Sequence, residues 1–347
     1  MRPGGAGIGN AANARYKSAS HIGSQHAYRY RDVAKRLLPA YTTRWGRAHQ
    51  GDALDILKRL PDRCAALVLT SPPFALRRQK EYGNVSADQY VDWFWPFAEE
   101  IHRILKDDGS FVYELGGAWN PGSGTRSLCQ YQLILRLANR FHLAQEFYWF
   151  NPSKLPTPAE WVTIRRTRVK DAVTTLWWLS KSTEPLADNR QVLKPYSRSM
   201  KRLLRDGYKV ALRPSQHEIG PHFQRDNGGA IPPNLLSIPN TRSSDDYLKK
   251  CRQAGEAIHP ARFPPGLPEF FIRFLTRPRD LVIDPFAGSN TTGQAAQGLK
   301  RRWLAIEINA DYVAGSRVRF EDATDLTIRR GSAASSSGAR TALPDAG

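Results

Sequence analysis

The sequence predicts an α/β fold built on a largely parallel sheet, and three observations carry that prediction. Short apolar runs bounded by turn formers recur along the chain, which is typical of strands buried on both faces. Segments with apolar residues at helical spacing separate these runs. The alternation of strand and helix favours a parallel sheet covered by helices over an all-helical or all-strand fold.

The clearest strand of the first half is Ala-Ala-Leu-Val-Leu at 65–69. The helix after it is expected to start with a capping box made by Ser86 and Gln89 and to kink at Pro96. Asp108 and Gly109 are expected to turn the chain into the next strand. The expected elements of this half are a strand over 65–69, a helix over 90–105, a strand over 110–115, a helix over 128–140, and strands over 147–150 and 173–179.

The second half has a weaker pattern before two further strands. Between residues 181 and 260 the periodicity fades, and residues 190–213 hold eight basic residues against one acid. This segment fits a basic face laid along a phosphate backbone, and a solvated surface helix is the alternative. Strands are expected at 281–283 and 303–307, with a helix that opens at Thr291.

The composition points to a polyanionic partner. The chain has 347 residues, with 51 Lys and Arg against 32 Asp and Glu, a net charge of +19. Such a charge favours nucleic acid as the partner. Three cysteines without a CxxC spacing argue against a disulfide framework or a structural zinc site, so neither disulfides nor a metal are expected. No apolar run approaches the roughly 20 residues that cross a bilayer, so no membrane contact is expected, and the setting expected is the cytoplasm.

The chain divides into one large domain and two flanking segments. Residues 1–40 form a basic arm expected to be disordered, and residues 331–347 a Ser-rich tail expected to be disordered. The domain between them, residues 41–330, has a first half at about 48–180, a second half at about 256–325 and a region at about 150–255 that separates them.

Residues 70–74, Thr-Ser-Pro-Pro-Phe, are the first candidate site. Pro72 and Pro73 force an extended backbone and provide no N–H, so the carbonyls of Ser71 and Pro72 have few local donors. Phe74 places a flat apolar face beside these acceptors. A row of acceptors next to an aromatic plate suits a planar heterocycle that bears an exocyclic amine, and a proline-stiffened strand end is the alternative.

Residues 281–293 are the second candidate site, where a short strand ends at Asp284 and a glycine-bearing loop opens a helix. Gln294 and Ala295 stand where a P-loop needs Lys and Ser or Thr, so nucleoside triphosphate binding is not expected. Glu307 ends the next strand, 23 residues after Asp284, which is near the offset at which an acid meets ribose hydroxyls. A nucleoside cofactor without a pyrophosphate, such as S-adenosylmethionine, fits these features.

These motifs resemble those of the bacterial amino-DNA methyltransferases. Asp284-Pro285-Phe286-Ala287-Gly288 resembles the cofactor loop of that family, and Ser71-Pro72-Pro73-Phe74 resembles its catalytic motif in the cytosine-N4 form. Residues 259–264 resemble the motif that opens the helix before the cofactor strand. The catalytic motif precedes the cofactor motif, which is the permuted order called the β class. The resemblance covers roughly residues 50–320.

The resemblance implies a Rossmann-like doubly wound methyltransferase sheet with an inserted target-recognition region at about 150–255. It implies transfer of a methyl group from S-adenosylmethionine to the N4 amine of a cytosine that is flipped out of duplex DNA. The catalytic residues are then Ser71, Pro72, Pro73 and Phe74, and the cofactor-binding residues are Asp52, Asp284, Pro285, Phe286, Gly288, Ser289, Asn290, Thr291 and Glu307.

Two basic clusters fall where the family places target recognition, and we expect them to bind DNA. They are Arg165, Arg166, Arg168 and Lys170, and Lys201, Arg202 and Arg205. Plain surface charge is the alternative reading of both. A short palindrome such as CAGCTG is the expected target if the resemblance extends through residues 150–250. The resemblance also implies a prokaryotic monomer at the nucleoid, with a cognate restriction endonuclease as genetic partner.

Three other functions are compatible with the motifs. An adenine-N6 enzyme of the same fold usually carries Asp or Asn in place of Ser71. An enzyme that methylates an amine in RNA or protein, or a catalytically silent DNA-binding module, would also use a basic surface. A cytosine-C5 enzyme is not expected, because none of the three cysteines follows a proline and that chemistry needs a loop-borne thiolate.

Overall fold

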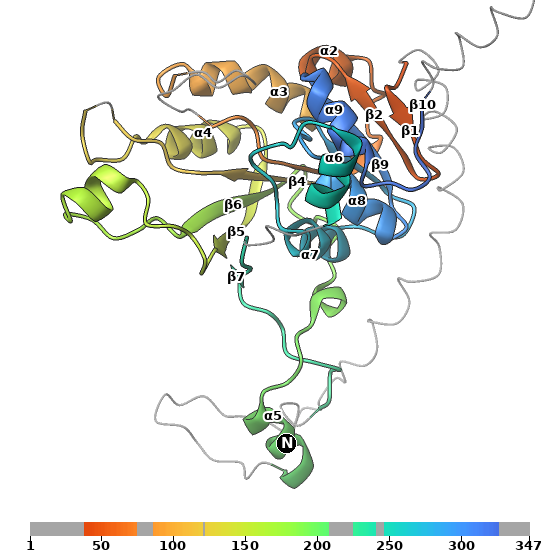
Figure 1. Cartoon of the computed structure of the whole chain (residues 1–347). Helices are drawn as coiled ribbons and strands as arrows, with labels where there is room; N and C mark the ends of the chain where they lie inside the picture. The colour runs from red at the N-terminus through yellow and green to blue at the C-terminus, as the bar shows by residue number, and fades with distance from the viewer. Residues whose placement is uncertain (1–37, 75–85, 121, 208–224, 241–245, 326–347) are drawn as a thin grey trace, which may run out of the picture.

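A computed structural model describes residues 38–74, 86–120, 122–207, 225–240 and 246–325. Residues 1–37 of the arm expected at 1–40, the segment 75–85 and the tail expected at 331–347 lie outside the described residues. The described chain builds one ten-stranded sheet in the order β10-β1-β2-β9-β8-β3-β4-β6-β5-β7 (Figure 1).

The centre of the sheet is parallel and its two ends are mixed. The strands β2 (Gly46–Gln50), β9 (Arg302–Glu307), β8 (Leu281–Asp284), β3 (Ala65–Thr70) and β4 (Leu105–Leu115) pair in parallel. On one side follow β6 (Val173–Ser180), β5 (His142–Phe150) and β7 (Leu235–Ser237), and on the other β1 (Tyr41–Thr42) and β10 (Thr324–Asp325). Both β4–β6 and β5–β6 are antiparallel. The prediction of a largely parallel sheet is therefore confirmed for the five central strands.

Helices cover both faces of this sheet, as a doubly wound fold requires. One face carries α2 (Ala53–Lys58), α3 (Tyr90–Ile104) and α4 (Cys129–Leu137), and the other carries α7 (Gly266–Leu275) and α8 (Thr291–Gly298) (Figure 1). The remaining helices are α5 (Arg198–Asp206), α6 (Asp246–Ala254) and α9 (Ala310–Arg317), with a π-helical turn at Glu160–Ile164 and a 3-10 turn at Asn189–Val192.

Alternating side chains of the central strands divide the core into two layers. In β8, Leu281 and Ile283 pack toward α2, α3 and α4, whereas Val282 packs toward α7 and α8. In β9, Ile306 joins the first layer and Trp303 the second. Because side chains point to opposite faces at every second residue, a strand that is apolar at every position buries both faces.

Two local predictions were wrong. Ser86 and Gln89 do not form a capping box, because α3 begins at Tyr90 and the Ser86 hydroxyl donates to the Gln89 side chain in the turn before it (3.2 Å). Asp108 and Gly109 lie within β4 and make no turn, because β3 and β4 accommodate them by a register shift between Ala65 and Leu67. The helix α3 continues through Pro96.

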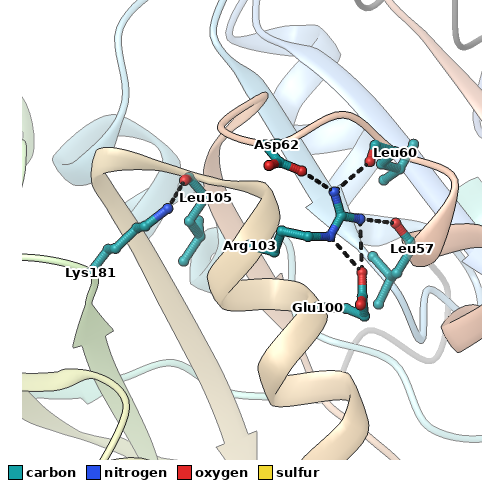
Figure 2. Close-up of polar contacts among 7 residues, drawn as sticks. All are labelled: Leu57, Leu60, Asp62, Glu100, Arg103, Leu105 and Lys181. Atoms are coloured by element: carbon teal, nitrogen blue, oxygen red, sulfur yellow. Dashed lines mark hydrogen bonds and ion pairs between the residues drawn. The ribbon is translucent and has the colours of Figure 1, made fainter.

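Arg103 fixes α2 against α3 and so sets the position of the residues at the start of α2. Its guanidinium donates to the carbonyls of Leu57 and Leu60 at the end of α2 (2.9 and 2.8 Å), and it pairs with Asp62 and Glu100 (Figure 2). A cation at the carbonyl end of a helix satisfies acceptors that have no partner within the helix. Within the described residues, no helix is long and apolar enough to cross a membrane.

Candidate active site

A cavity of about 660 Å³ opens at the carboxyl ends of the central strands. Its lining includes Ser71 after β3, Glu114 near the end of β4, Asp284 at the end of β8 and Glu307 at the end of β9. In an open parallel sheet, the crevice at the carboxyl ends of the strands is the usual ligand site. The cavity therefore brings the two candidate sites of the sequence, at 71–74 and 284–291, into one cleft.

Asp284 is buried and holds the start of this cleft together. Thr70 donates to one of its oxygens (2.7 Å), Thr292 donates to the other (2.7 Å), and the backbone N–H of Phe286 adds a third bond (3.2 Å). Burial raises the pKa of Asp284 to about 6, while the three donors lower it. Asp284 thus links β3, β8 and α8, and its oxygens are already occupied by protein donors.

Glu307 sits beside the β8–α8 loop (residues 285–290). Its carboxylate accepts from the backbone N–H of Gly288 and of Asn309, both at 2.9 Å. Burial raises its pKa, and these backbone bonds counteract the effect. Gly288 has φ +50°, and a Cβ there would lie 2.9 Å from Nε2 of His259, so a side chain at this position would be strained and crowded.

The start of α8 is built by Asn290, which does not line the cavity. This residue adopts the left-handed conformation, caps α8 by accepting from Gly293 N–H (3.0 Å) and donates to the Tyr41 hydroxyl (3.1 Å). It is 1% exposed. Its predicted neighbours Ser289 and Thr291 do line the cavity. Asn290 was expected to bind the cofactor, but here it caps the helix and supports the loop without lining the cavity.

Ser71 and Glu114 form a polar pair, of which the sequence predicted only Ser71. The Ser71 hydroxyl donates to Oε2 of Glu114 at 2.6 Å. Burial raises the pKa of Glu114 to about 7, and the bond from Ser71 and the charge of Lys154 lower it. Glu114 is the single acid of the strand expected over 110–115, between Tyr113 and Leu115, and this departure from the apolar pattern is the signal that could have identified it.

Aromatic rings form a wall of the cleft. Phe97 lies 5.2 Å from the Phe286 ring centre, and Trp93 lies 6.0 Å from it. Phe74 stands after Pro73 at the cleft, close enough to the backbone that a Cβ on Gly116 would lie 2.7 Å from its ring. Rings at these distances present flat apolar surfaces to a planar ligand.

Asp52 is in the cleft and also caps α2. Its carboxylate accepts from the backbone N–H of Asp55 (3.1 Å), and its side chain lines the cavity beside Gly51. The lining also includes residues that were not among the predicted site residues, and those with large or polar side chains include Trp93, Phe97, Glu114, Trp149, Lys154, Thr174, Asn240, His259 and Arg262. They come from separate segments of the chain, and only His259 and Arg262 lie in a motif that the sequence showed, at residues 259–264.

The first basic cluster lies on the β5–β6 loop (residues 151–172), and part of it is engaged within the protein. Arg165 pairs with Glu160 (2.7 Å) and stacks on Trp161, and Arg168 lies 3.8 Å from the Trp119 ring centre. The Lys170 ammonium donates to the carbonyl of Lys154 (3.1 Å). Arg166 is exposed and makes no hydrogen bond or ion pair with another residue in the described part of the chain.

The second basic cluster lies on α5, which stands apart from the sheet and its helices (Figure 1). Lys201, Arg202 and Arg205 are exposed there, and Arg205 pairs with the neighbouring Asp206 (2.7 Å). The helix has no buried residue. Neither cluster lines the cavity. Within the described residues no group of three or more His, Cys, Asp or Glu side chains could hold a metal ion.

Comparisons with known proteins agree with this geometry. A family described as DNA methylase matches residues 65–317. The type II methyltransferase M.PvuII of Proteus hauseri is 52% identical over 289 residues, which are 82% of this chain and 86% of the relative. The DNA adenine methyltransferase YhdJ of Escherichia coli is 25% identical over 270 residues, 76% of this chain and 78% of the relative.

A solved structure described as PvuII DNA methyltransferase (cytosine-N4-specific) superposes on this fold. Its TM-score is 0.67 at 46% identity, over 82% of this chain and 90% of that chain. The superposition extends the likeness from sequence motifs to the arrangement of the sheet.

Proposed function

This chain belongs to the DNA methylase family as a cytosine-N4-specific methyltransferase of the type II restriction–modification class, and on that premise we propose how its cleft performs the reaction. The hydrogen bond from Ser71 to Glu114, at one wall of an acid-lined cleft, is the observation that carries the proposal. It gives an acceptor for an amine and a base for its proton in one place.

The cleft has the chemistry that S-adenosylmethionine needs. The cofactor has a sulfonium cation, a ribose diol and an adenine ring, and the lining offers the acids Asp52 and Glu307 and the aromatic wall that includes Phe286. Glu307 would accept from the ribose, and Phe286 would pack on the adenine. Ser289, Thr291 and the Gly288 backbone would shape the loop around it. When bound, the cofactor supplies an electrophilic methyl group, so positioning the acceptor is the main task left to the protein.

Ser71 and Pro72 would hold the cytosine amine. Because the Ser71 hydroxyl donates its hydrogen to Glu114, a lone pair of its oxygen remains to accept from one N4 hydrogen. The Pro72 carbonyl would accept from the other, and Pro73 keeps this backbone extended. These two bonds draw N4 toward a tetrahedral geometry and expose its lone pair, while Phe74 stacks on the ring.

Glu114 would take the proton that N4 loses when N4 accepts the methyl group and the C–S bond of the sulfonium breaks. The proton would pass from N4 to the Ser71 oxygen as the Ser71 hydrogen passes to the Glu114 carboxylate. A carboxyl whose pKa is about 7 can accept this proton at neutral pH and release it afterwards. Glu114 is in this account the general base, and Ser71 connects it to the substrate.

The substrate is duplex DNA, and the exposed basic residues would bind its backbone. The target amine lies inside the duplex, so the cytosine must leave the base stack to reach Ser71. Arg166, Lys201 and Arg202 are exposed and suited to phosphate contacts. Arg165, Arg168, Lys170 and Arg205 are included in the proposed surface, although protein groups already engage them.

The finer features of the proposal follow from likeness to the type II relative. We propose a short palindrome such as CAGCTG as the target, a cognate restriction endonuclease as genetic partner, and a monomer that works on the prokaryotic chromosome in the cytoplasm. The domain limits proposed from sequence, 41–330 with a target-recognition region at about 150–255, place both basic clusters between the catalytic and cofactor motifs.

Nucleoside analysis tests the proposed reaction. Plasmid DNA is methylated by the purified chain, digested to nucleosides and examined by mass spectrometry. N4-methylcytosine is expected in the wild-type digest, and at a strongly reduced level after the same reaction time in the digest made with Ser71→Ala. N6-methyladenine without N4-methylcytosine would show the adenine-specific alternative, and neither product would leave the silent or RNA- and protein-directed alternatives.

A further inference from the structure

The β5–β6 loop stands at the edge of the active-site cleft. Trp149 and Thr174, near its two bases, line the cavity, and so does Lys154 within the loop. The strands that it joins are paired directly up to Phe150 and Val173. In Figure 1 the loop extends beyond the end of these strands and carries the short π-helical turn. A base that enters the cleft from a duplex therefore meets this loop.

The first part of the loop is braced in one conformation. Asn151 N–H donates to the carbonyl of Ala172 (2.8 Å), and Asp171 N–H donates to the carbonyl of Thr157 (3.2 Å). The Lys170 ammonium reaches back to the carbonyl of Lys154 (3.1 Å). Prolines at 152 and 156 further restrict the backbone. The residues between these prolines are consequently held in place before any ligand arrives.

Leu155 is a large apolar side chain exposed at this braced position. It is 74% exposed and follows directly after Lys154, which lines the cleft. The loop that carries it has five Lys and Arg residues and two acids. A partner that attracts this charge and also receives an apolar side chain fits duplex DNA, whose backbone is anionic and whose base stack is apolar.

We propose that Leu155 is a wedge that enters the base stack at the place left by the flipped cytosine. The proposal rests on the proposed function, because it needs a base that leaves the duplex. Flipping breaks the pair and the stacking of the target, and an apolar side chain inserted between base steps compensates for part of that loss. Leu155 is thus a positioning residue, which acts on the position of the cytosine and not on its amine.

Mismatched substrates isolate this role. Two duplexes carry the site that the wild-type enzyme methylates, one with the target cytosine opposite guanine and one with it opposite adenine. Because a mispaired base is easier to extrude, the second duplex needs the wedge less. Values of kcat/KM are measured on both for the wild type, Leu155→Ala, Leu155→Met and the matched control Ile164→Ala, whose side chain is 69% exposed on the same loop.

Leu155→Ala is expected to lower kcat/KM on the paired duplex by about tenfold to a hundredfold, and to match the wild type within about threefold on the mismatched one. Leu155→Met should restore most of the loss, and Ile164→Ala should behave as the wild type on both duplexes. A loss of equal size on both duplexes, or none on either, would overturn the wedge while leaving the proposed function intact. A wild type that methylates neither duplex would overturn the proposed function and the wedge with it.

Discussion

The β8–α8 loop and the β5–β6 loop serve the same cleft and are built in opposite ways. In the first, Ser289 and Asn290 are 2% and 1% exposed, and protein groups bond their side chains. In the second, Leu155 and Val169 are 74% and 86% exposed. The side proposed for the cofactor is thus complete before a ligand binds, whereas the side proposed for DNA keeps large apolar side chains exposed to water.

This difference divides the energetic roles of the two sides. A buried acid that is held by protein donors costs solvation free energy but needs no reorganisation when a ligand arrives. Exposed cations gain their main free energy when they displace counterions from DNA. We therefore expect substitutions on the two sides to affect different steps.

Ser71→Ala should have the largest effect, because it removes the link between the cytosine amine and Glu114. We expect kcat to fall by about a hundredfold to ten-thousandfold, and the dissociation constant of S-adenosylmethionine to stay within about twofold, since no cofactor contact is assigned to this hydroxyl. Single-turnover methylation and calorimetric titration measure the two quantities. A loss of cofactor affinity as large as the loss of turnover would contradict the role given to Ser71.

Glu114→Gln should make the protein more stable and less active. The pKa of Glu114 is raised from 4.5 to about 7, so the unfolded chain ionises first as the pH rises. Folding stability is then lost between pH 4.5 and 7, by roughly 3 kcal/mol in total. The Gln variant escapes this loss and should unfold at higher urea than the wild type at pH 8, but not at pH 4. If the urea midpoint of the variant equals that of the wild type at both pH values, burial does not raise the pKa of Glu114.

The activity of the wild type should rise with pH through about 7, because Glu114 must be ionised to accept the proton. The residual activity of Glu114→Gln should lack this rise. A pH profile of single-turnover rates at saturating cofactor measures both. An identical rise in the two proteins would assign the titration to another group.

Much of the cofactor side could be predicted from sequence, because buried strands and tight loops leave local patterns. The strand at 65–69, Asp284 and Glu307 all lie where their patterns placed them. The short strands β1, β7 and β10 have two or three residues each and no period to detect. Glu114 meets Ser71 only through the pairing of β3 with β4, 43 residues apart in the chain.

The DNA side was less predictable for a physical reason. Basic residues in a row predict a charged surface, but they do not show which cations the protein itself engages. The position of Arg168 over Trp119 depends on a contact between segments about 50 residues apart. Leu155 stands out only when its exposure and the neighbouring cleft are known.

Phe286→Ala and Glu307→Gln should weaken cofactor binding and leave DNA binding unchanged. The first removes a ring from the aromatic wall, and the second replaces the acceptor proposed for the ribose while keeping its size. We expect the cofactor dissociation constant to rise about tenfold in each case. Calorimetry with cofactor and filter binding with DNA separate the two affinities. A fall in DNA affinity with cofactor affinity unchanged would mean that the site is misplaced.

Neutralising exposed cations should have the smallest effect at each position. Arg166→Ala and Arg202→Ala should each lower the slope of log affinity against log salt by about 0.9 for a lost phosphate contact. Lys300→Ala, an exposed lysine away from both clusters, is the control. If the quadruple change of Arg165, Arg166, Arg168 and Lys170 to Ala leaves the slope as it was, this cluster is ordinary surface charge.

The salt dependence of two dissociation constants of the wild-type protein tests the division between the two sides most directly. Cofactor and duplex DNA are titrated separately at several salt concentrations between about 50 and 200 mM. The buried acids and aromatic wall predict a cofactor affinity that changes little over this range, and the exposed cations predict a DNA affinity that falls steeply. A cofactor affinity that falls in parallel with the DNA affinity would contradict the account, because both ligands would then depend on the same exposed charge.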